Sequence, residues 1–224
     1  MSVTARARVV ELRHGRVGTL HHAGTLEPSA IGKARAIGPV HLGSLGFDGD
    51  AVGDTVHHGG PDKAACVYAE ARYGAWRSRY GADLPRPAFG ENLLLAGTDE
   101  ERTCVGDVYA LGGAVVQVSQ PRVPCYKPAA FTGERRLTVD LRTTGWTGWY
   151  LRVIEPGVVA EGDAARLLER SDGAVSVARL NALRYGDEID VDGLLTAAAA
   201  PGLMPAWRDA LTRRATGRGT SDDD

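Results

Sequence analysis

Glycine and proline recur throughout the chain, and their wide spread limits the fold more than any other feature of the sequence. The 224 residues contain 29 glycines and 11 prolines, which are scattered and not clustered. Such residues mark tight turns, so the elements between them should be short. β-branched and aromatic residues fill many of the intervals, as they do in strands. The sequence therefore predicts a mainly β fold with helices, of the α+β class.

Six runs of apolar and β-branched residues predict the strands of this fold. They cover residues 7–12, 29–42, 93–95, 107–119, 146–154 and 164–168. We place turns at Gly15, Gly18 and Gly24. The run 107–119 should be a hairpin, because Gly112 and Gly113 supply the positive φ angles that its turn requires.

The chain after residue 173 has a different character. Ser176 suits a helix N-cap, and Val177, Leu180 and Leu183 share one helical face. Two more short helices fit residues 192–200 and 205–214. We therefore predict a β domain over residues 1–172, a three-helix appendage over residues 173–215 and a disordered polar tail over residues 216–224.

Composition argues against several classes of protein. The formal net charge of −2 gives no electrostatic case for binding nucleic acid or an anionic membrane. No apolar run approaches the ~20 residues of a membrane-spanning helix, and residues 1–6 lack the apolar core of a secretory signal. Three cysteines without paired spacing argue against a disulfide framework. We therefore expect a cytoplasmic protein.

Residues 117–127 form the first candidate site, because a predicted strand ends there in a stiff, cationic turn. Pro121 and Pro124 each fix one φ angle and restrict the residue before them. Arg122 and Lys127 flank Cys125, and nearby positive charge lowers the pKa of a thiol from about 8.5. The resulting thiolate is a nucleophile and a soft metal ligand. The alternative is a small buried cysteine, which is how we interpret the other two cysteines.

Residues 58–63 form a second candidate, a glycine pair before a predicted helix. Pro61 suits the first helical position, and apolar spacing extends the helix to about Tyr80. Free amides at Gly59 and Gly60, with the positive end of the helix dipole, would favour a phosphate. Lys63 would then face that anion. An ordinary loop with a solvated lysine fits these residues equally well.

Three polar groups of residues have weaker signals. Residues 43–54 are interpreted as turns with solvated carboxylates in preference to a divalent-metal loop, because they lack the calcium-loop spacing. Glu91 and Asn92 precede the strand at 93–95, where polar groups can meet a ligand; the alternative is a turn with a solvated glutamate. The adjacent His57 and His58 would point to opposite faces of an extended segment, which disfavours a shared zinc ion.

Absent motifs narrow the chemistry further. The sequence has no Gly-x-Gly-x-x-Gly, P-loop, Gly-x-Ser-x-Gly or Cys-x-x-Cys motif. It therefore has no recognisable site for a dinucleotide, a nucleoside triphosphate or an iron–sulfur cluster. If the chain performs redox chemistry, its electrons come from elsewhere.

Three motifs in this order resemble those of the MOSC domain, named for the C-terminal part of molybdenum cofactor sulfurase. They are HGGPDKA at 58–64, FGENL at 89–93 and QVSQPRVPCYK at 117–127. More narrowly, the chain is similar to the YiiM-like branch, the 6-N-hydroxylaminopurine resistance proteins. The match spans roughly residues 25–170, and the closing helices resemble the three-helix appendage of that branch. His57 and Pro128 stand where relatives usually have apolar residues.

The resemblance implies a partly open β-barrel that binds a molybdenum cofactor, molybdopterin. Cys125 would be the catalytic residue and the protein ligand of the metal, and the cofactor's phosphate suits the second candidate segment. The implied cofactor-binding residues are Gly59, Gly60, Lys63, Asn92, Gln120 and Arg122.

The resemblance also implies an activity, the reduction of N-hydroxylated compounds to amines. A separate flavin or iron–sulfur reductase would then be the electron-donating partner, and a small N-hydroxylated molecule the substrate. One alternative is a carrier of the cofactor or of its sulfur, with a persulfide on Cys125. Another is a cysteine hydrolase that pairs Cys125 with His58. A homodimer through the closing helices is left open.

Overall fold

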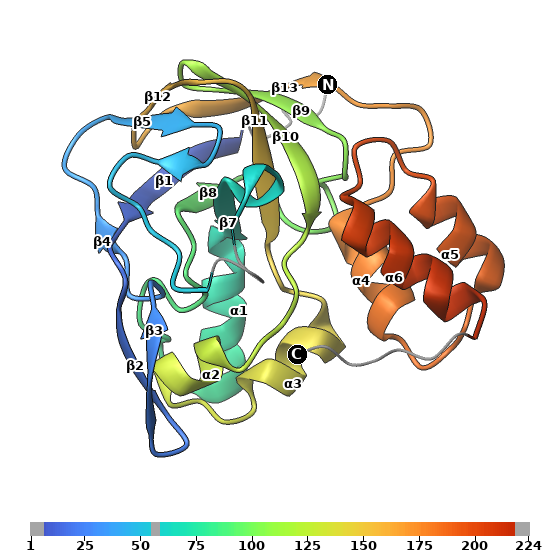
Figure 1. The fold of residues 1–224 in the computed structure, drawn as a ribbon, viewed down its shortest axis with the longest axis horizontal. Coiled ribbons are helices and arrows are strands. Elements are labelled where there is room, and N and C mark those ends of the chain that lie inside the picture. The colour runs from blue at the N-terminus through green and yellow to red at the C-terminus, as the bar shows by residue number, and fades with distance from the viewer. Residues whose placement is uncertain (1–6, 55–58, 218–224) are drawn as a thin grey trace.

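Seven strands of the described chain close into a β-barrel (Figure 1). The computed structural model describes residues 7–54 and 59–217. The strands of the ring are β1 (Ala7–His14), β7 (Ala65–Ala69), β8 (Leu93–Ala96), β9 (Val108–Leu111), β10 (Ala114–Pro121), β11 (Trp149–Glu155) and β13 (Ala164–Glu169). Their order around the barrel is β13-β9-β10-β11-β7-β8-β1, and β1 returns to pair with β13.

The predicted α+β class and the barrel are confirmed, and the ring is closed where the resemblance implied a partly open one. The closing ladder is short, with Ala7 opposite Ala165 and Arg8 opposite Ala164. β7 and β8 run parallel, whereas the other neighbours in the ring are antiparallel. The predicted hairpin is present as β9 and β10.

The remaining strands of the described residues lie outside this ring. They are β2 (Gly18–His22), β3 (Thr25–Ser29), β4 (Ala34–Arg35), β5 (Val40–Gly43), β6 (Gly46–Phe47) and β12 (Gly157–Val159). The short strands predicted within residues 29–42 are present as the end of β3, β4 and most of β5, and Gly32, Gly38 and Pro39 lie between them. The turn predicted at Gly18 was wrong, since this residue begins β2.

Six α-helices of the described residues surround the barrel. They are α1 (Glu70–Tyr80), α2 (Lys127–Thr132), α3 (Leu137–Thr144), α4 (Val177–Tyr185), α5 (Val191–Ala198) and α6 (Pro205–Ala215). The prediction that a helix begins at Pro61 was wrong. Only a single 3-10 turn, η1 (Pro61–Lys63), precedes β7, and α1 begins later. Every residue of β7 is buried, and such a continuous apolar run carries no alternation that would identify a strand.

The closing helices pack beside one side of the barrel (Figure 1). Ser176 caps α4 as predicted, accepting a hydrogen bond from the Arg179 amide at 3.1 Å. Leu180 and Trp207 belong to the same buried cluster as the barrel residue Val116. The domain boundary near residue 173 stays a prediction, and residues 218–224 of the predicted tail lie outside the described residues. Among the described residues, no helix has the length and apolar character that crossing a membrane requires.

Candidate functional site

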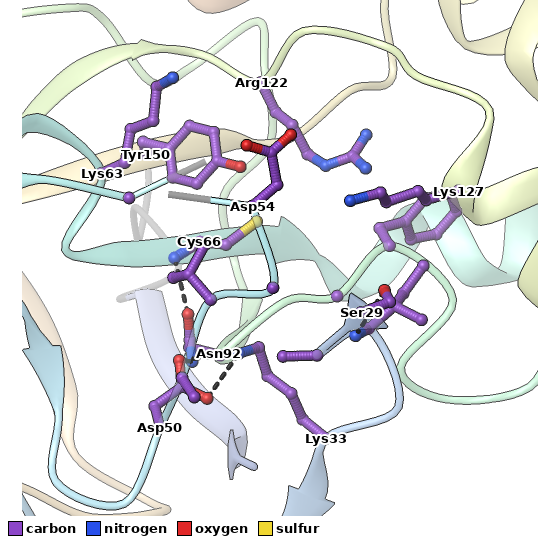
Figure 2. Close-up of a pocket in the computed structure, with 18 of the residues that line it drawn as sticks. Ser29, Lys33, Asp50, Asp54, Lys63, Cys66, Asn92, Arg122, Lys127 and Tyr150 are labelled. Atoms are coloured by element: carbon purple, nitrogen blue, oxygen red, sulfur yellow. Dashed lines mark hydrogen bonds and ion pairs between the residues drawn. The ribbon is translucent and has the colours of Figure 1, made fainter. Parts of the chain in front are cut away.

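A pocket of about 120 Å³ lies where β7, β11 and the turn after β10 meet the loops that follow β3 and β6 (Figure 2). Sequence segments that are far apart contribute to its wall. The predicted site residues that line it are Gly59, Lys63, Asn92, Arg122 and Cys125. The structure therefore brings the three candidate segments to one place. Gly60 and Gln120 are not among the lining residues, so their predicted contacts with a cofactor stay predictions.

Cys125 is half-buried at the pocket wall, in the turn that connects β10 to α2. The turn is anchored at its start, because the Arg122 amide donates a hydrogen bond to the Gly148 carbonyl at 3.0 Å. The Cys125 Sγ then lies 3.7 Å from Nη2 of Arg122. The sulfur atom is thus held beside a fixed positive charge and within reach of the cavity.

Arg122 is only 4% exposed, which is unusual for an arginine. Its Nη1 atom is buried and has no hydrogen-bond partner among the described residues. Burial opposes the charge, but Cys125 and Tyr150 beside the guanidinium raise its pKa above the ordinary value. A buried charged donor without an acceptor is costly to the fold. The arrangement therefore suits an anionic group that enters the pocket and completes the hydrogen bonds.

The segment before η1 reaches the pocket without the predicted helix. Gly59 and Gly60 adopt φ angles of +122° and +86°, which L side chains rarely adopt. A helix dipole does not favour a phosphate at this segment, because η1 is only a single turn. Lys63 remains at the pocket wall, and burial lowers the pKa of its ammonium group. His57 and His58, including the proposed pairing of His58 with Cys125, lie outside the described residues.

The acidic loop is only partly solvated, contrary to the interpretation of residues 43–54. Asp48 is exposed, but Asp50 accepts hydrogen bonds from Lys33 Nζ at 2.5 and 2.7 Å. Asn92 Nδ2 donates to the same carboxylate at 2.8 Å. Asn92 Oδ1 accepts a hydrogen bond from the Cys66 amide at 3.0 Å. Much of the Asn92 amide is therefore engaged in holding the pocket wall together.

Glu91 faces the protein interior and does not line the pocket. It is 1% exposed, accepting hydrogen bonds from the Tyr73 hydroxyl at 2.5 Å and from the Phe89 amide at 3.0 Å. Glu91 therefore neither faces a ligand in the pocket nor is exposed to solvent, so both interpretations of this residue were wrong. Its role is to fix the loop before β8.

Sequence reasoning missed several lining residues. The most informative of these are Ser29, Lys33, Cys66 and Tyr150. Cys66 is buried as expected of a small hydrophobic cysteine, and burial raises the pKa of its thiol to about 12. Among the described lining residues, four cationic side chains face two carboxylates, so the pocket is positive although the chain is not. Ser29, Cys66 and Tyr150 lie in three different strands and Lys33 lies in the loop after β3, so no spacing in the sequence indicates that they share one pocket.

Comparison with protein-family models gives two matches. The MOSC domain matches residues 54–166, and the YiiM-like 3-alpha helix domain matches residues 175–216. The first match covers the barrel strands from β7 to β11 and the start of β13, with the pocket residues from Asp54 onward, and the second covers the closing helices.

Individual relatives agree with these matches. The protein YflK of Bacillus subtilis is 39% identical over 93% of this chain and 95% of its own length. The crystal structure of YiiM from Geobacillus stearothermophilus is 33% identical and superposes with a TM-score of 0.79, covering 93% of this chain and 99% of that one. A protein named reductase from Gibberella moniliformis is 36% identical over 72% of this chain. The match covers 29% of that relative's own length.

Proposed function

Because the chain belongs to the MOSC domain family and to its YiiM-like branch, we propose that it is a molybdenum-cofactor-dependent reductase of N-hydroxylated compounds. The compound 6-N-hydroxylaminopurine, which would be reduced to the amine, is the example that the family suggests. MOSC domains are associated with the molybdenum cofactor, and one relative of this chain bears the name reductase. The family and this relative support an oxidoreductase activity in general, and the residues of the pocket support binding of the cofactor.

One observation carries the proposal: Arg122, whose buried Nη1 atom has no hydrogen-bond partner among the described residues, lines the same pocket as Cys125. A cofactor with a soft metal centre and an anionic phosphate requires both a thiolate and fixed positive charge. These residues therefore fit the group. Lys63 and Lys127 add positive charge to the same wall.

The residues of the chain have separate tasks in this proposal. Cys125 would be the ligand of the metal, and Arg122, whose Nη2 atom lies 3.7 Å from the Cys125 Sγ atom, would bind an anionic group of the cofactor. When bound, the molybdenum cofactor supplies the two-electron chemistry, which no side chain can. Asn92 keeps the wall opposite in place through its bonds to Asp50 and the Cys66 amide.

The overall reaction balances with two electrons and two protons. The N–O bond of the hydroxylamine breaks, a proton and the electrons complete the amine, and the hydroxyl oxygen leaves as water. A separate flavin or iron–sulfur reductase would supply the electrons. The substrate is small, because it shares one pocket with the cofactor.

The test is molybdenum analysis of freshly purified protein combined with reduction of 6-N-hydroxylaminopurine, with a chemical reductant as electron source. Wild type should contain molybdenum and produce the amine. Cys125→Ala should lose most of both. Cys104→Ala is the matched control, because Cys104 is buried outside the pocket and should keep both.

Two results would contradict the proposal in different ways. Molybdenum content that is unchanged in Cys125→Ala would remove the cysteine as the ligand. Cofactor binding without turnover, when electrons are supplied, would instead favour a carrier of the cofactor or of its sulfur.

A further inference from the structure

Arg152 on β11 joins three segments that are distant in sequence. Its Nε atom donates to Asp62 Oδ1 at 2.7 Å, in the turn that carries Lys63. Its Nη1 atom donates to Gln117 Oε1 on β10 at 2.7 Å and to the Gly202 carbonyl at 2.8 Å. Gly202 lies between α5 and α6. One guanidinium thus connects the pocket turn, the strand that leads to Cys125 and the closing helices.

Ser119 makes a second connection between the same segments. Its buried hydroxyl donates to the Asp62 carbonyl at 2.5 Å. Its own carbonyl accepts a hydrogen bond from the Met204 amide at 3.0 Å. The turn around Asp62 is therefore held through both its side chain and its main chain. In each case the residue that holds it also contacts the loop between α5 and α6.

That loop is itself closely seated on the barrel. Gly202 has a φ angle of +79°, and a Cβ atom there would lie 2.8 Å from the Gly106 Cα atom. Backbone of the loop and backbone of the barrel therefore approach so closely that only glycine fits. Movement of the helices would be transmitted to Arg152 and Ser119.

We propose that Arg152 is a positioning residue for the turn that carries Lys63, and that the closing helices act on the pocket through it. The structural part of this proposal concerns the chain alone. Its consequence for the cofactor rests on the proposed function, because Lys63 is then a residue that faces the cofactor's anionic group.

Hydrogen exchange of the cofactor-free protein tests the structural part. In Arg152→Met, the amides of Gly60, Asp62, Lys63 and Ala64 should exchange about tenfold faster or more, because the charge-assisted hydrogen bond to Asp62 is lost. Amides of β8 should exchange as in wild type. The lysine of Arg152→Lys can reach one of the three partners, so the exchange rates of this variant should lie between those of wild type and Arg152→Met. Arg79→Met removes an ion pair with Asp140, away from the pocket, and serves as the control.

The role of the helices is tested by Gly202→Ala, which alters no residue of the barrel. The same amides at 60–64 should be exposed more often in this variant. If Gly202→Ala does not fold, the Arg152 variants still decide whether Arg152 positions the turn. Unchanged exchange at these amides in a folded Gly202→Ala would overturn the part of the proposal that concerns the helices. Unchanged exchange at 60–64 in Arg152→Met would overturn the proposal. So would equal acceleration throughout the chain, or the same pattern in Arg79→Met.

Molybdenum content then tests the consequence for the cofactor. Arg152→Met should retain several-fold less molybdenum than wild type or Arg79→Met, and full retention would overturn this part. If wild-type protein contains no molybdenum, the proposed function fails, whereas the exchange experiment still decides whether Arg152 positions the turn.

Discussion

The Arg122 guanidinium is buried without a full set of partners among the described residues, so its charge weakens the fold that holds it. A buried charge costs several kcal/mol unless its hydrogen bonds are complete, and replacing buried ionic groups by well-packed apolar side chains of similar volume is often neutral or stabilising by about 1–4 kcal/mol. We therefore expect Arg122→Met to raise the free energy of unfolding of the cofactor-free protein. The same variant should lose most of its molybdenum. Urea unfolding and metal analysis of one preparation measure both effects.

Arg122→Lys is the matched variant, because it keeps the charge but not the planar group that can contact the sulfur and a second acceptor together. It should retain more molybdenum than Arg122→Met and should show no gain in stability. A stabilised Arg122→Met that retains full molybdenum content would show that the guanidinium has no part in binding.

Glu91 gives a pH dependence with a defined sign. Burial raises the pKa of this carboxyl above its ordinary value of 4.5, although hydrogen bonds from Tyr73 and Phe89 act in the opposite direction. The folded state therefore holds the proton more tightly than the unfolded state does. The stabilisation that results is fully present below about pH 4.5 and is lost as the pH rises through the raised pKa of the folded state.

The measurement is urea unfolding of wild type and Glu91→Gln at a series of pH values. The stability advantage of wild type over the variant should shrink as the pH rises above 4.5. The hydrogen bonds that glutamine cannot make add a constant offset, which does not change the slope. An advantage that grows with pH would contradict the raised pKa.

Sequence reasoning at the residue scale succeeded where the chemistry is local. Arg122 and Cys125 lie three positions apart in a proline-braced turn, so their proximity could be inferred from spacing alone. The pairing of Lys33 with Asp50 could not, because irregular loops bring the two together and no periodicity records it. Asn92 was recognised as lying at the pocket, but its bonds to the wall depend on the fold.

At the scale of elements, the entry into η1 depends on backbone conformations that favour glycine. Gly60 has a φ angle of +86°, and a Cβ atom added there would meet no atom of the described residues within 4 Å. Gly60→Ala should therefore destabilise the fold by about 1–2 kcal/mol through backbone strain alone. Gly74 has similar open space on the exposed face of α1 and lacks a positive φ angle. Gly74→Ala should stabilise by about 0.5–1 kcal/mol.

Thermal or urea unfolding of the two variants measures this difference in sign. Equal effects at the two positions would mean that the Gly60 conformation is not fixed in solution. Such a result would also weaken the assignment of a defined turn before Lys63.

The elements differ in how far the sequence could predict them. The hairpin of β9 and β10 and the capped helix α4 follow from local signals, namely a glycine pair and a serine before an apolar face. β7 does not, because burial of both its faces makes its residues uniformly apolar. α2 and α3 were not predicted either, and they are short helices that pack against the rest of the protein.

At the scale of the whole molecule, the barrel and the closing helices share one buried core. Leu180 and Trp207 from the helices and Val116 from the barrel belong to a single apolar cluster. The protein should therefore unfold in one transition, with coincident midpoints by tryptophan fluorescence and far-UV circular dichroism. Leu180→Ala should lower the free energy of unfolding by about 2–5 kcal/mol and move both midpoints together. Two separate transitions would show that the helices fold independently.

The sequence predicted the α+β class and the closing helices, and the resemblance on three motifs implied the barrel and predicted the family. The closed ring was not predicted, since it depends on a two-pair ladder between strands at opposite ends of the barrel sequence. Links between the helices and the pocket were also beyond sequence reasoning. They pass through Arg152 and Ser119, which have no distinguishing motif.

The central claim is that Cys125 binds the molybdenum of the cofactor. Molybdenum X-ray absorption of freshly purified protein tests this most directly, because it counts the sulfur atoms around the metal. We predict that Cys125→Ser either loses the metal or shows one sulfur ligand fewer than wild type. Identical sulfur coordination at full metal content in the two proteins would contradict the claim.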